Sequence, residues 1–128
     1  MALIVLDASV IIAHLDPADA LHARAVSALT AVSGDDLVLP ASALAETLVI
    51  PARRGRLSDA RAAIDTLLIR IHPLTDTIAE VAAGLRAAHR TLRLPDALVV
   101  ATGDHLDADG VLTADRKWTR INSRVRLV

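Results

Sequence analysis

Short apolar runs alternate with longer segments of helical periodicity along this chain. Three runs without polar interruptions lie at residues 2–6, 37–39 and 111–113. Such runs are typical of strands buried on both faces of a parallel sheet. A weaker run at 69–74 contains Pro73 and predicts an edge strand, where proline is tolerated, and a last strand is expected at 125–127. Strands that alternate with helices predict an α/β fold, a three-layer sandwich with a short, mainly parallel central sheet.

Residues that start and stop helices divide the segments between these strands. The main expected helices span about 17–32, 41–54, 58–68, 75–90, 96–106 and 115–120. Asp16 is expected to cap the first of these, with Pro17 in its first turn, and Ser58 to cap the third. Pro51 implies a kink or an early end in the second. The helix that opens at Asp96 is apolar on nearly all sides in its middle, so it should be buried.

Composition limits the class of protein. A chain of 128 residues suits one domain over 1–128, and 53% hydrophobic with 23% charged residues excludes wholesale disorder. There is no cysteine, so disulfides and thiolate chemistry are absent, which fits the reducing cytoplasm. No basic segment precedes the first apolar run, and Asp7 interrupts it, so neither a signal peptide nor a membrane span is expected. Trp118, the only aromatic residue, is expected in the core or at a dimer contact.

The net charge of −1 conceals three clusters of basic residues. They lie at 53–56, 86–93 and 116–126, and all but one of their Lys and Arg residues are arginine. Arginine suits bidentate contact with phosphate, so the clusters can follow a nucleic-acid backbone. On charge alone, solvated helix faces and loop ends are the more common explanation of such clusters. Charge alone leaves both interpretations open.

Four acidic residues stand where an apolar run ends or a helix begins: Asp7, Glu46, Asp96 and Asp115. If the first and third runs are parallel strands of one sheet, Asp7 and Asp115 emerge at the same edge, where ligands bind in open α/β sheets. Each acid alone has a simpler explanation. Asp7 or Asp115 can cap a helix, Asp96 can interact with a helix dipole, and Glu46 can occupy the polar side of its helix.

The four acids together are harder to explain as caps. Two carboxylates about 4 Å apart repel by about 4 kcal/mol at an effective dielectric constant of about 20. A bound cation removes that cost. Mg²⁺ prefers oxygen ligands and keeps several waters, and Mn²⁺ also fits. The pattern therefore predicts a metal-dependent hydrolytic site.

Four ordered motifs carry a resemblance to a known family. They are LIVLDAS at 3–9, PASALAE at 40–46, LPDAL at 94–98 and LTADRKW at 112–118. In this order and over essentially the whole chain, they resemble the PIN-domain nucleases, and more narrowly the VapC-type toxins of bacterial toxin–antitoxin pairs. The family's acidic positions match Asp7, Glu46, Asp96 and Asp115, and its usual hydroxyl neighbours match Ser9 and Thr113.

The resemblance implies a metal-dependent endoribonuclease that a cognate antitoxin inhibits and that commonly forms a homodimer. The expected roles are metal binding by Asp7, Asp96 and Asp115, catalysis by Glu46 and Asp115, and positioning of the acids or a phosphate by Ser9 and Thr113. Apolar helix faces within 10–32 and 41–68 are the expected docking surfaces for the antitoxin.

One departure from the family pattern and three alternative functions bear on this interpretation. Some relatives carry a further acid after the fourth position, where this chain has Arg116 and Lys117, which argues against a tightly held second metal ion. A haloacid-dehalogenase-type phosphatase needs an acid where Ser9 stands and a lysine before the last acids, and the only lysine is Lys117. A receiver domain needs an acid pair after the first strand. A PIN-fold interaction module without activity remains the non-enzymatic alternative, and the intact four acids argue against it.

Overall fold

The central feature of the fold is a five-stranded sheet in which every neighbouring pair of strands is parallel. The computed structural model describes all residues from 1 to 128, and the strand order is β3-β2-β1-β4-β5. The strands are β1 (Leu3–Leu6), β2 (Asp36–Pro40), β3 (Arg70–His72), β4 (Gly110–Thr113) and β5 (Val125–Leu127). The predicted α/β sandwich is confirmed, and its sheet is parallel throughout.

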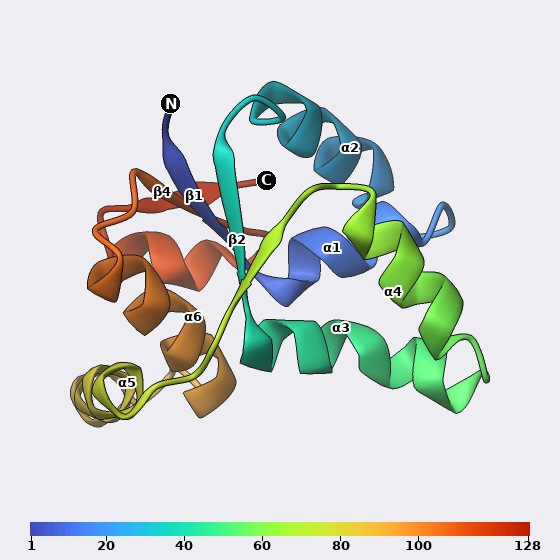
Figure 1. Ribbon diagram of the computed structural model, residues 1–128. Helices are drawn as coiled ribbons and strands as arrows, with labels where there is room; N and C mark the ends of the chain where they lie inside the picture. The colour runs from blue at the N-terminus through green and yellow to red at the C-terminus, as the bar shows by residue number, and fades with distance from the viewer.

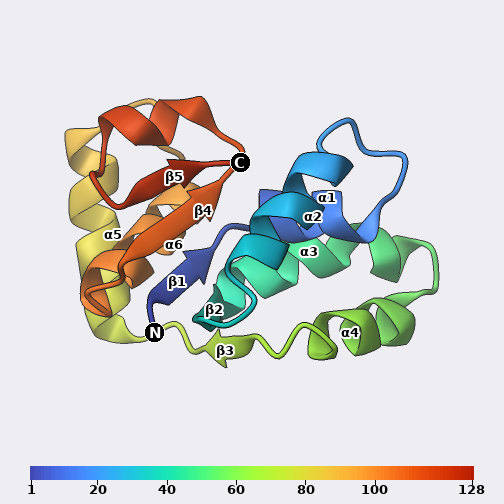
Figure 2. The same ribbon diagram turned by 90° about the horizontal axis from the view of Figure 1, so that it is seen from above.

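Helices cover both faces of this sheet (Figures 1 and 2). They are α1 (Ala8–Leu15), α2 (His22–Ala31), α3 (Ala41–Arg53), α4 (Leu57–Asp65), α5 (Asp76–Ala88), α6 (Leu94–His105) and the 3₁₀ helix η1 (Arg116–Arg120). From β1 through β2 to β3 the chain moves one way across the sheet, and from β3 it returns to β4 and β5. Right-handed crossovers therefore place α1 to α4 on one side, and α5, α6 and η1 on the other.

The core follows from the apolar runs. Residues 4–6 of β1, 37–39 of β2 and 111–112 of β4 are buried, as are six residues in the middle of α6. Gly103 allows this helix to lie close to the sheet, because a Cβ atom there would stand 2.6 Å from Cγ2 of Val111. The prediction that α6 is buried is confirmed, and Trp118 packs in the core.

Two predicted helix starts are wrong. The helix after Asp16 begins at His22, because Asp16 and Asp19 accept hydrogen bonds from the backbone N–H groups of Ala18 and Leu21 and form turns instead. Ser58 does not cap α4, which begins one residue earlier, at Leu57. Pro51 does not end α3 early, since the helix continues two residues beyond it.

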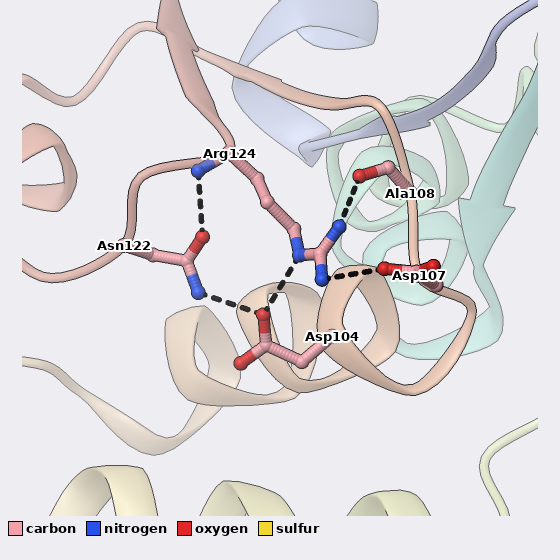
Figure 3. Close-up of polar contacts among 5 residues, drawn as sticks. All are labelled: Asp104, Asp107, Ala108, Asn122 and Arg124. Carbon is pink, nitrogen blue, oxygen red and sulfur yellow. Dashed lines mark hydrogen bonds and ion pairs between the residues drawn. The ribbon is translucent and has the colours of Figure 1, made fainter.

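Besides its pairing with β4, the edge strand β5 is linked to the end of α6 and the turn after it by the arginine that precedes the strand. Arg124 donates hydrogen bonds to the side chains of Asp104 and Asp107 and to the carbonyl oxygen of Ala108 (Figure 3). Asn122 donates to the same Asp104 oxygen and accepts from the Arg124 backbone. This arginine of the C-terminal basic cluster therefore has a structural role.

None of the helices combines the length and apolar character needed to cross a membrane.

Candidate active site

The candidate site lies where the sheet's connections diverge. β1 pairs with β2 on one side and with β4 on the other. After β1 the chain continues toward one face of the sheet, into α1, and after β4 it continues toward the opposite face, into η1 (Figure 2). A crevice forms at such a switch point, outside the carboxyl ends of the strands. Asp7 follows β1 directly and Asp115 comes two residues after β4, so both predicted acids stand at this point.

The side chain of Asp7 is held by two hydroxyl groups and not by a basic side chain. Its Oδ2 atom accepts hydrogen bonds from Ser9 Oγ at 2.6 Å and from Thr113 Oγ1 at 2.9 Å. The residue is only 6% exposed, and no Arg, Lys or His forms an ion pair with it. Burial raises the pKa of the Asp7 carboxyl, and the two hydroxyl donors oppose that rise.

The backbone after β4 fixes the direction of these hydrogen bonds. The N–H of Ala114 donates to Ser9 Oγ at 3.1 Å, and the N–H of Asp115 donates to Thr113 Oγ1 at 3.1 Å. Each hydroxyl oxygen thus accepts from the backbone and has its own proton free for Asp7. The network joins the ends of β1 and β4 and presents both protons to one carboxylate oxygen, which favours the charged form.

Glu46 and Asp96 approach this centre from two helices. Asp96 lies in the first turn of α6 with its side chain 16% exposed, and Arg93 Nε is 3.6 Å from its Oδ2. Burial and then the negative charge of Asp7 raise the pKa of Asp96. Arg93 lowers this pKa, and the charge of Asp115 raises it. Burial raises the pKa of Glu46, in the second turn of α3, and the charges of Asp7 and Asp96 raise it further. The four acids therefore share one electrostatic environment.

Helix capping accounts for only part of the acidic set. Asp115 does cap η1, because its Oδ1 accepts from the N–H of Lys117 at 2.9 Å. Asp7 occupies the cap position of α1 but makes no capping hydrogen bond, since its side chain turns toward β4 instead. Capping therefore explains Asp115 in part and leaves the buried position of Asp7 unexplained. Arg93 is the neighbour that the site prediction omitted, although its spacing of three residues from Asp96 in a helical segment signalled it.

The side-chain atoms that could ligate a metal ion at this site suit a hard divalent cation. All of them are oxygens, and the buried carboxylate of Asp7 lacks a positive partner. No three acidic or histidine side chains stand close enough together to hold a metal ion by themselves. Mg²⁺ accepts one or two carboxylates completed by waters and substrate phosphate, so this open arrangement suits it. The set of three metal ligands inferred from the sequence is not preassembled, and that assignment stays a prediction.

The sequence model of the PIN domain matches residues 4–123, and the chain belongs to the PIN domain family. The family resemblance inferred from the four motifs is therefore confirmed. No curated protein sequence matches the chain.

Several solved structures have a similar fold. A toxin–antitoxin complex from Klebsiella pneumoniae has 24% sequence identity and a TM-score of 0.79, over 98% of this chain and 96% of its own. The Mycobacterium tuberculosis toxin VapC20, described as cleaving the sarcin–ricin loop, has 22% identity and a TM-score of 0.73, over 93% and 96%. FitAcB from Neisseria gonorrhoeae has 25% identity and a TM-score of 0.68, over 88% and 87%.

Proposed function

We propose that this chain is a metal-dependent endoribonuclease, a single domain over residues 1–128, and the toxin of a toxin–antitoxin pair. The observation that carries the proposal is the buried Asp7 carboxylate at the switch point, oriented by Ser9 and Thr113 and coupled in charge to Glu46 and Asp96. A plain scaffold has no need to bury a carboxylate without a cation, because that arrangement costs stability. The site of action is the cytoplasm, where cellular RNA is found.

Each residue of the site has a separate proposed role in the hydrolysis of a phosphodiester bond. Asp7, Asp96 and Asp115 would hold one Mg²⁺, with Mn²⁺ as a substitute. A bound ion of this kind polarises the phosphate and lowers the pKa of a water molecule. Ser9 and Thr113 fix the direction of the Asp7 carboxylate and oppose the rise in its pKa that burial causes. Glu46 accepts a proton from the attacking water as general base, a role that its raised pKa and its solvent access both suit. The family resemblance also assigns Asp115 to the catalytic set, and its backbone N–H helps to position the Thr113 hydroxyl.

The test of this activity is cleavage of a fluorescently labelled single-stranded RNA with and without Mg²⁺. The variants Asp7→Asn and Asp96→Asn should lose cleavage at least a hundredfold while remaining folded. Asp76→Asn is the matched control, because Asp76 is an exposed acid in the first turn of α5, the position that Asp96 has in α6. Cleavage by either site variant at the wild-type rate, in a preparation free of contaminating nuclease, contradicts the proposal.

The antitoxin part of the proposal has its own surface. An open groove of about 570 Å³ runs between α1, α3 and α4, and its apolar lining is Ile12, Leu15, Ile50, Pro51, Ala60 and Ala63. Ile12 and Ile50 are 39% and 46% exposed, so apolar side chains are available to a partner helix. The groove lies within the two segments from which antitoxin docking was expected.

Partner binding is tested by copurification of a coexpressed antitoxin. Ile50→Asp should abolish copurification and leave RNA cleavage unchanged, whereas Val81→Asp, an exposed apolar position on α5, should alter neither. Retention of the antitoxin by Ile50→Asp contradicts this docking surface. The family resemblance also favours a homodimer, for which sedimentation should give twice the mass of one chain.

A further inference from the structure

A second hollow lies outside the acidic centre, between the segment that joins α5 to α6 and the helix η1. It is an open pocket of about 520 Å³ lined by His89, Thr91, Arg116, Lys117, Arg120 and Ile121. No acidic residue lines it. Three of its six residues are basic, and the threonine and histidine add hydrogen-bond donors.

The three cations of this basic pocket have no partner within the protein. Five other arginines pair with aspartates: Arg56, Arg61, Arg70, Arg93 and Arg124. Arg86 and Arg126 donate to backbone carbonyl oxygens. The side chains of Arg116, Lys117 and Arg120 form no ion pair and no hydrogen bond. Like charges gathered around a hollow repel one another, and an anion placed among them relieves that repulsion.

Both walls of the basic pocket continue directly into the acidic centre. Arg116 follows Asp115 in the chain, and the Lys117 N–H donates to the Asp115 carboxylate at 2.9 Å. On the other wall, the segment from His89 leads into α6, which carries Asp96 in its first turn. The pocket therefore adjoins Asp115, and its other wall leads along the chain toward Asp96.

We propose that this basic pocket binds a backbone phosphate of the RNA strand, next to the phosphate that is cleaved; this inference rests on the proposed ribonuclease function. Arg116 and Arg120 offer paired N–H donors to phosphate oxygens, Lys117 adds a point charge, and Thr91 adds a hydroxyl. Ile121 provides an apolar surface for the adjoining sugar. RNA suits this position better than an acidic peptide, because every RNA linkage carries a charge. A strand with one phosphate at the acidic centre must therefore place others beside it.

The test is the salt dependence of RNA binding, measured by fluorescence anisotropy in chelator so that nothing is cleaved. The double variant Lys117→Ala/Arg120→Ala should raise Kd about tenfold at low salt, by the same factor for RNAs of different sequence. The slope of log Kd against log salt should fall by about 0.7, since the pocket holds one phosphate and each phosphate contact with a single strand contributes about 0.7. The control Arg24→Ala/Arg53→Ala removes two exposed, unpaired arginines elsewhere and should leave both quantities unchanged. Lys117→Arg/Arg120→Lys keeps both charges and should keep the slope.

The outcomes separate the two proposals. An unchanged slope in Lys117→Ala/Arg120→Ala overturns the phosphate site, whether or not the wild-type protein cleaves RNA. The phosphate site is also overturned if the double variant loses only a protein partner and binds RNA normally, which would make the pocket a protein contact. If the slope falls as expected but the wild-type protein cleaves no RNA with Mg²⁺, the phosphate site stands and the ribonuclease proposal fails.

Discussion

Replacing Thr113 by valine tests whether a single hydroxyl keeps Asp7 charged. The two side chains have nearly the same shape, and Thr113 is fully buried, so the change removes hydrogen bonds without opening a cavity. Two hydrogen bonds disappear: the one donated to Asp7 at 2.9 Å and the one accepted from the Asp115 N–H at 3.1 Å. A hydrogen bond to a charged group contributes about 2 kcal/mol and a neutral one about 1 kcal/mol, so the expected loss is about 3 kcal/mol.

The assay is urea unfolding in chelator, near neutral pH and again at about pH 4. In a parallel thermal scan near neutral pH, the loss should lower Tm by about 10 °C, given about 3–4 °C per kcal/mol for a domain of this size. Loss of the hydroxyl removes a contact that lowers the pKa of Asp7, so that pKa rises further in the variant. As pH falls through the raised pKa of Asp7, its carboxyl becomes neutral, and the difference between the two proteins should shrink by about 1 kcal/mol, toward that of neutral hydrogen bonds.

Thr102→Val is the matched control for this experiment. Thr102 is also buried, but its hydroxyl donates to the Leu98 carbonyl oxygen within its own helix at 2.7 Å. Its replacement should cost less than about 1 kcal/mol and should not depend on pH. The proposed role of the Thr113 hydroxyl is refuted if Thr113→Val costs no more than Thr102→Val, or if its cost is the same at both pH values.

Three further predictions use other parts of the molecule. In chelator, the free energy of unfolding should decrease as pH rises from about 4 through the raised pKa values of the site acids, because the folded protein there binds more protons than the unfolded chain. Asp7→Asn should flatten this decrease and abolish the rise in Tm that excess Mg²⁺ produces in the wild type; a rise of equal size in the variant would place the ion elsewhere. Gly103→Ala should destabilise the fold by about 2 kcal/mol, because the new methyl group overlaps Val111 at 2.6 Å, whereas Gly84→Ala in the open middle of α5 should stabilise it by about 0.5–1 kcal/mol. Equal effects at both glycines in thermal unfolding would contradict the close approach of α6. Arg124→Ala should lower Tm by a few degrees and Arg124→Lys should restore only part, because lysine lacks the planar fork that reaches Asp104, Asp107 and Ala108 together (Figure 3); full restoration by lysine would show that charge alone suffices.

Residue order was sufficient to predict most of the fold. Apolar runs without alternation located the buried strands, because only a sheet covered on both faces accommodates them. The apolar middle of α6 predicted its burial for the same reason. The start of α2 was wrong because Asp16 and Asp19 can either cap a helix or close a turn. Which of these occurs depends on neighbouring backbone groups that a residue pattern does not contain.

The candidate site was predictable as a set of residues but not as an arrangement. The motifs named Asp7, Glu46, Asp96 and Asp115, and the topology brought them into one electrostatic environment. The motifs could not show that Asp7 forgoes the cap of α1 and turns toward Thr113, since that choice depends on a contact between residues 106 positions apart.

The basic clusters show the same division most clearly. The sequence shows several arginines in the C-terminal cluster but does not show which of them pair with acidic residues. The folded chain ties Arg124 to aspartates of α6 and its following turn, and leaves Arg116 and Arg120 unpaired around a pocket beside the acids. The sequence by itself determined the kinds of side chain and the strands and helices that carry them, because those depend on local pattern and burial. Only the tertiary structure decided which charges are neutralised within the protein and which stay available to a ligand, because pairing depends on distances between segments far apart in the chain.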